Sequence, residues 1–202
     1  MISIFNIIKN ANKFSKYDIN GEKKSKFAFN FFIYNLFPII FGLAVCYLSR
    51  DFFEFETTTI GALLSLFTGL LFGLLLKISD KVRQVPSKES AKSENQKNKR
   101  IQETNYLKMF FYFLSYSILI SLGIITLLII QSFIPALHET KLSTHIFTTN
   151  VNFSTLYDFI CVSLIYSYRF FIIYFLTNFI LYIILSIGYL YEYIMFDFSK
   201  IE

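Results

Sequence analysis

Long apolar runs separated by shorter polar stretches dominate this chain. Four of the runs contain no charged residue: residues 27–48, 57–76, 109–134 and 170–190. Because an α-helix needs about 20 apolar residues to cross the hydrocarbon core of a bilayer, each run predicts a transmembrane helix. The pattern therefore predicts an all-α integral membrane protein, with a basic amphipathic segment at 1–26 and a four-helix transmembrane domain at 27–202.

Small residues recur at a spacing of four in the second run, at Gly61, Ser65, Gly69 and Gly73. Residues at this spacing share one stripe of a helix, and small residues let membrane helices approach closely. The first run repeats the spacing at Pro38, Gly42 and Cys46. We expect the two stripes to face each other in a helical hairpin, although the second stripe is equally suited to packing against another copy of the chain.

Basic residues are distributed unevenly between the connections. The first 30 residues carry six lysines, and residues 77–108 carry nine Lys/Arg against four Asp/Glu, whereas residues 49–56 and 136–158 carry only Arg50 and Lys141. Lysine and arginine stay on the cytoplasmic side of a membrane. The sequence therefore predicts that both termini and loop 77–108 are cytoplasmic and that loop 135–169 lies outside. The basic isoelectric point of the chain is explained by these cytoplasmic segments, and we expect no direct contact with nucleic acid.

The basic loop has two interpretations. It is either a topology signal that also attracts anionic lipid, or a docking stalk for a soluble cytoplasmic protein. The second helix is expected to run to Val85 and stop at Pro86, and Ser93 with Gln96 resembles a capping box that begins the third helix. The candidate residues for a partner or for lipid headgroups are Lys77, Lys81, Arg83, Lys88, Lys92, Lys97, Lys99 and Arg100.

The last apolar tract, residues 159–196, is too long to lie wholly inside a bilayer. As one helix it would measure about 57 Å, against about 30 Å for the hydrocarbon core. We expect Arg169 to mark the outer interface, with its side chain reaching the headgroups. Residues 159–168 would then lie on the outer surface or extend the helix outward. Residues 1–17 predict a short interfacial helix.

Candidate chemistry is sparse. His138 and His145 give a weak signal for a metal site, which needs three or four ligands around one point. Cys46 and Cys161 would both lie near the outer face, where a disulfide is conceivable but free packing is the simpler expectation. We find no nucleophile elbow, phosphate loop or zinc-protease motif, so the sequence predicts neither an enzyme nor a cofactor. Interhelical hydrogen bonds are the simplest role for the polar membrane residues Asn35, Gln131 and Asn178.

Residues 63–83, LLSLFTGLLFGLLLKISDKVR, are followed by the basic loop and a long third helix. This layout resembles the small four-helix membrane proteins of bacterial anti-phage defence systems, such as the membrane subunit of the Kiwa system. The resemblance implies a homo-oligomer, with a tetramer as the first guess, in the bacterial inner membrane. It also implies that the protein detects infection at the membrane and couples to a soluble DNA-binding effector. No catalytic residue is carried over.

Two other functions suit the same pattern. A pore-forming effector that depolarises the membrane would need a polar stripe through the bilayer, and the polar residues of the spans are too dispersed to define one. A structural membrane accessory protein would need only the packing surfaces.

Overall fold

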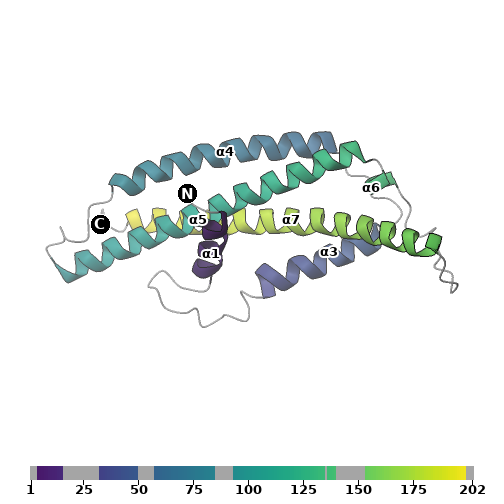
Figure 1. Ribbon diagram of the computed structural model, residues 1–202. Coiled ribbons are helices and arrows are strands. Elements are labelled where there is room, and N and C mark those ends of the chain that lie inside the picture. The colour runs from purple at the N-terminus through teal and green to yellow at the C-terminus, as the bar shows by residue number, and fades with distance from the viewer. Residues whose placement is uncertain are drawn as a thin grey trace.

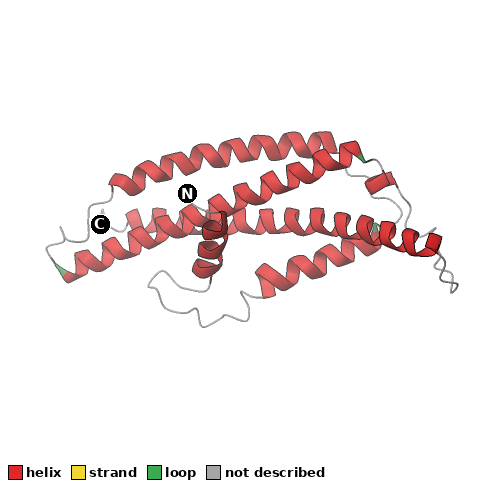
Figure 2. Cartoon of the chain, in the orientation of Figure 1, coloured by secondary structure: helices red, strands yellow, loops and turns green. Residues whose placement is uncertain are grey.

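The computed structural model describes residues 4–15, 32–49, 57–84, 93–134, 136–139 and 153–198, and the regular structure within these ranges is helical (Figure 2). In chain order the elements are α1 (Ile4–Ser15), the π-helix η1 (Phe32–Leu36), α3 (Phe37–Leu48), α4 (Thr57–Gln84), α5 (Glu94–Phe133), α6 (Ala136–Glu139) and α7 (Phe153–Phe198).

Three of these helices are long and apolar enough to cross a membrane: Thr58–Arg83, Gln96–Phe133 and Tyr157–Met195. They cover the second and third predicted spans except for residues 57 and 134, and all of the fourth, which indicates a multi-pass membrane protein. The first predicted span appears as the shorter apolar helix Phe32–Leu48, about 25 Å long, and its residues 27–31 lie outside the described ranges. A fourth crossing and the sidedness of the termini therefore stay predictions.

An antiparallel pair of long helices, α5 and α7, forms the centre of the bundle (Figure 1). α4 packs along α5, and α3 packs along α7 on the opposite side of the pair. The short helix α1 crosses α5 and buries Ala11 against it, while Phe5 remains exposed. Every helix of the bundle thus contacts one of the two central helices.

Aromatic side chains fill the interface between α5 and α7. Tyr182 lies at their centre, with its ring centroid 5.9 Å from that of Phe113 and 4.7 Å from that of Tyr116, the latter at an interplanar angle of 86°. It also stacks on Tyr34 of η1 at 6.0 Å, and Phe113 stacks on Tyr189 at 5.5 Å. One aromatic cluster therefore joins η1, α5 and α7.

Small hydroxyl residues allow the close approach of α4 and α7 to α5. Ser117 and Ser121 of α5 and Ser186 of α7 are buried, and the Ser121 hydroxyl lies 2.7 Å from that of Thr68 on α4. Ser117 and Ser121 stand four residues apart, the small-residue spacing that brings membrane helices together. The hydroxyls of Ser117 and Ser186 also donate to carbonyls one turn back in their own helices, which satisfies them in an apolar setting.

The sequence predicted that the first two apolar runs pack against each other as a hairpin, and this pairing is wrong. Pro38, Gly42 and Cys46 are buried as a stripe, but the stripe packs on α7. A Cβ atom at Gly42 would lie 3.1 Å from Cε2 of Phe170. A bulky ring fills a groove of small residues more completely than a second small-residue stripe would, which explains why the stripe of α3 packs on α7 and not on α4. The π-helix before α3 accommodates Pro38, whose missing N–H cannot serve the preceding turn.

Candidate functional site

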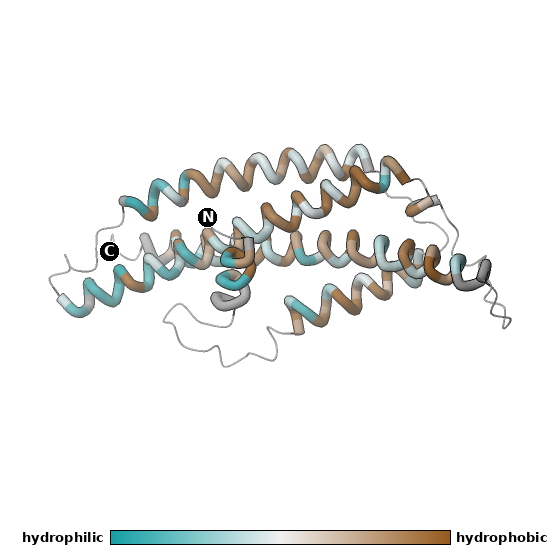
Figure 3. Tube along the Cα trace, viewed as in Figure 1, coloured by the Kyte–Doolittle hydropathy of each residue, from teal (hydrophilic) through white to brown (hydrophobic). Residues whose placement is uncertain are grey.

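The end of the bundle that carries most of the described Lys and Arg side chains is its strongest candidate site. We call it the basic end: residues 77–84 of α4, 94–108 of α5 and 189–198 of α7, which lie at the same end of the bundle in Figure 3, with α4 and α5 hydrophilic there. The other end, with α6 and the first turns of α7, is called the opposite end. α5 and α7 run without a break from one end of the bundle to the other, so these two helices connect the two ends mechanically.

Helix boundaries at the basic end follow the sequence signals. α4 ends at Gln84, two residues before Pro86, which agrees with the predicted stop to within one residue. α5 begins after Ser93, whose hydroxyl oxygen accepts a hydrogen bond from the backbone N–H of Gln96 at 3.3 Å. The predicted N-cap is therefore confirmed, and from it one helix of 40 residues runs into the apolar span.

Apolar and aromatic contacts hold the three helices together at the basic end. Ile78 of α4, Leu107 of α5 and Tyr189 and Tyr193 of α7 are all buried in one cluster. The ammonium group of Lys81 lies 4.6 Å from the centroid of the Tyr193 ring, a cation–π contact between α4 and α7. These contacts give the basic end a packed core where the three helices leave the apolar part of the bundle.

Most basic side chains at this end point to solvent. Lys88 and Lys92 lie outside the described residues. Arg100 is half-buried, and the exposed cations are Lys77, Lys81, Arg83, Lys97, Lys99 and Lys108. They form a positively charged surface suited to an acidic protein face or to anionic lipid headgroups. Of the eight predicted residues, the structure places six at this end, and it adds Lys108.

A second polar cluster lies at the opposite end, where Arg169 is 1% exposed. Its Nε donates a hydrogen bond to the carbonyl oxygen of Leu137 in α6 at 3.1 Å. The predicted snorkelling of Arg169 to the outer surface is therefore wrong. A backbone carbonyl in the turn after α5 supplies the acceptor that the headgroups were expected to supply, and the guanidinium stays inside.

Tyr168 and Gln131 extend this cluster between α7 and α5. The Tyr168 hydroxyl lies 2.8 Å from the carbonyl oxygen of Leu127 and 3.0 Å from Oε1 of Gln131. Gln131 is thus an interhelical hydrogen-bonding residue, as predicted, although its buried Nε2 has no partner among the described residues. Asn178 instead bonds within its own helix, to the carbonyl of Tyr174 at 3.0 Å. The sequence indicated the polar residues but not this pairing with Tyr168.

Most of the small-residue stripe of α4 lies away from the face of the helix that packs against α5. Gly61 lies near Leu128 of α5, but Ser65 is exposed, and a Cβ atom at Gly69 or Gly73 would meet nothing within 4 Å. At 3.6 residues per turn, each step of four residues rotates by about 40°, so the stripe turns away from α5. Packing of this stripe inside the chain is limited to Gly61, and its contact with another copy stays a prediction.

The remaining candidates give no chemical centre among the residues that the structure describes. Cys46 and Cys161 are both free. The described residues hold no cluster of His, Cys, Asp and Glu that would bind a metal ion. His138 belongs to α6, whereas His145 lies outside the described ranges. The arrangement is one of packing and charged surfaces.

Comparison with known proteins gives no relative: no family model matches the chain, and no characterised protein or solved structure is significantly similar to it.

Proposed function

We propose that this protein is a membrane sensor or anchor of a bacterial anti-phage defence system, and that its basic end docks a soluble cytoplasmic protein. The observation that carries the docking proposal is the basic end itself. Residues 94–108 extend α5 by about 22 Å beyond its apolar segment, and they carry exposed cations on a helix that joins the packed core at Tyr106 and Leu107. A charged surface on a rigid support is suited to binding a protein with an acidic face.

The orientation assigned in this proposal rests on charge. The positive-inside rule places the basic end in the cytoplasm and the opposite end at the outer face of the bacterial inner membrane. An event at the outer face would then reach the cytoplasm through α5 and α7, which are continuous over 40 and 46 residues. The buried cluster of Gln131, Tyr168 and Arg169 lies where such an event would first alter the packing.

The defence role comes from the resemblance of residues 63–83 and of the layout that follows. In such a system the partner would be a soluble DNA-binding effector, held at the membrane or released from it. The exposed glycines of α4 leave room for a second copy of the chain, in keeping with a homo-oligomer.

Charge reversal at the start of α5 tests the docking proposal. Replacing Lys97, Lys99 and Arg100 by glutamate should weaken partner binding by about tenfold or more at low salt, because charge steering raises association rates about 10- to 1000-fold. Co-purification of a soluble cytoplasmic protein and protection of cells against phage should fall together. The matched control keeps the charge at the same positions: Lys97→Arg, Lys99→Arg and Arg100→Lys should retain both properties.

This experiment also requires that the charge-reversed protein inserts into the membrane in the same orientation as the unaltered protein. The six amino-terminal lysines and Lys77, Lys81 and Arg83 remain in the reversed protein and should preserve its topology. A charge-reversed protein that inserts correctly and still keeps its partner and its protection would show that the basic end is only a topology and lipid signal.

A further inference from the structure

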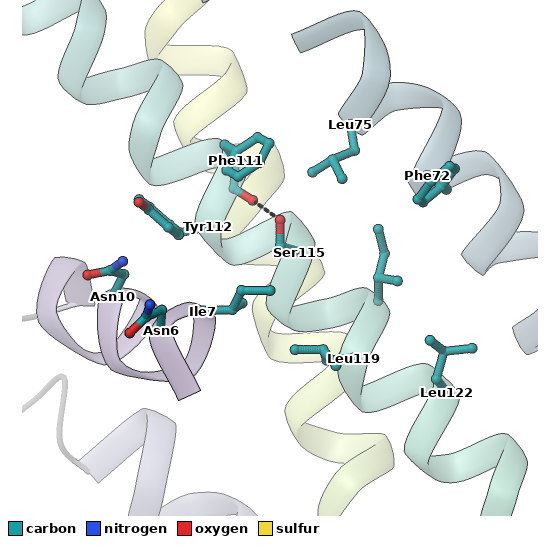
Figure 4. A pocket seen from close by; sticks show the side chains of 11 residues that line it. Asn6, Ile7, Asn10, Phe72, Leu75, Phe111, Tyr112, Ser115, Leu119 and Leu122 are labelled. Atoms are coloured by element: carbon teal, nitrogen blue, oxygen red, sulfur yellow. Dashed lines mark hydrogen bonds between the residues drawn. The ribbon is translucent and has the colours of Figure 1, made fainter. Parts of the chain in front are cut away.

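An apolar groove with a volume of about 520 Å³ follows the surface of α5 between α1 and α4 (Figure 4). α5 forms its floor, with Ser115 and Leu119 among the lining residues. Phe72 and Leu75 belong to the α4 wall, and Ile7 belongs to the α1 wall, from which its side chain points toward α5. The groove volume lies within the range of about 300–1000 Å³ that is typical of small-molecule sites.

Polar groups gather at one side and one end of this groove. Asn6 and Asn10 of α1 line it, and neither amide makes a hydrogen bond within the part of the chain that the structure describes. Lys108 precedes the lining residues Phe111 and Tyr112 by three and four positions, so it lies on the same face of α5, one turn away, where the basic end begins. It is exposed and has no ion pair among the described residues.

The length of the groove matches one leaflet of a bilayer. Its lining on α5 runs from Phe111 to Leu122, about 16 Å along the helix axis. Half of a hydrocarbon core of about 30 Å is about 15 Å. The groove also begins where the apolar segment of α5 begins, directly after Lys108. Its apolar part therefore corresponds to acyl chains and its charged end to headgroups.

We propose that the groove binds one acyl chain of an anionic phospholipid from the leaflet at the basic end, and that Lys108 binds the headgroup phosphate. The charge at the end of the groove favours a lipid over a helix from a second copy, because the Lys108 ammonium lies where the phosphate of an anionic headgroup would follow the apolar lining. α1 would then be held on α5 partly through the lipid, which links α1 to the composition of the membrane.

Lipid titration of the full-length protein tests the site. In native mass spectrometry from detergent, phosphatidylglycerol should bind as one molecule per chain in preference to phosphatidylcholine with the same acyl chains. Lys108→Gln should lower the affinity for phosphatidylglycerol about fivefold, the factor that corresponds to about 1 kcal/mol per basic residue near an anionic surface. Lys141→Gln removes the same charge from the connection between α6 and α7, outside the basic end, and should have little effect.

Filling the groove tests the position of the acyl chain. Leu119→Trp should reduce the binding of both lipids, whereas Leu66→Trp, at an exposed site of α4 outside the groove, should not. Phosphatidylglycerol with a photoreactive group in its acyl chain should label the peptide containing Leu119 in the unaltered protein, which keeps the test valid if Leu119→Trp misfolds.

Three results would overturn this inference. They are equal binding of the two lipids with no effect of Lys108→Gln, absence of labelling at the groove, and loss of oligomers in Leu119→Trp while lipid binding is unchanged. The last result would place a second copy in the groove. None of these measurements involves a soluble partner, so failure of the lipid site and failure of the docking proposal are distinguishable.

Discussion

Alanine at Tyr182 should lower the free energy of unfolding by about 3–5 kcal/mol, the usual cost of removing a large buried aromatic side chain. Tyr182 is 5% exposed, and its ring contacts the rings of Tyr34, Phe113 and Tyr116 on two other helices. Its loss would leave a cavity at the centre of the aromatic cluster that joins η1, α5 and α7. The change is measurable as a shift in the denaturation midpoint when the purified protein is titrated with sodium dodecyl sulfate.

Two variants control this prediction. Tyr191→Ala removes the same side chain from the same helix, but at a position that is 63% exposed, and should change the midpoint only slightly. Tyr182→Phe keeps the ring and should retain most of the stability. Equal losses for Tyr182→Ala and Tyr191→Ala would mean that the α5–α7 interface is not packed as described.

Leucine at Gly42 should displace α3 from α7. A Cβ atom there already lies 3.1 and 3.2 Å from two ring carbons of Phe170, and leucine adds three more carbons in the same direction. Overpacking of this kind costs about 1–3 kcal/mol, which corresponds to a roughly 5- to 150-fold larger population with α3 displaced. Cys46, which is buried under the same contact, reports the change through its rate of modification by a membrane-permeant maleimide in a Cys161→Ser background.

Gly73→Leu is the matched control for Gly42→Leu, because a side chain at Gly73 meets nothing within 4 Å in the chain. It should leave the modification rate of Cys46 unchanged. If Gly73→Leu instead dissociates oligomers in detergent, the stripe on α4 faces another copy, as the sequence allows. Faster modification of Cys46 in Gly73→Leu than in Gly42→Leu would contradict the described packing of α3.

Local patterns in the sequence predicted the elements of this fold well. Each apolar run after residue 57 lies in a helix, because about 20 uncharged apolar residues have few alternatives to a membrane helix. The end of α4 before Pro86 and the start of α5 after Ser93 follow from proline sterics and from N-capping, which act over three or four residues. Such short-range causes can be seen in the sequence.

The pairing of the elements was harder to predict. Helices that are apolar on all sides carry no hydrophobic face to mark the inward direction, and in lipid the packing depends on shape. The stripe on α3 was identified correctly, but its partner, Phe170, lies more than 120 residues away. Arg169 was placed at the surface because its acceptor, the backbone carbonyl of Leu137, has no side-chain signal in the sequence.

Cysteine accessibility in intact cells tests the central claim, that the chain crosses the membrane with its basic end in the cytoplasm. In a Cys46→Ser, Cys161→Ser background, a single cysteine replaces either Ser93, at the start of α5, or Thr148, in the connection before α7. An impermeant thiol reagent should label position 148 in intact cells and position 93 only after the membrane is opened. Labelling of position 93 in intact cells, with position 148 protected, would contradict the account.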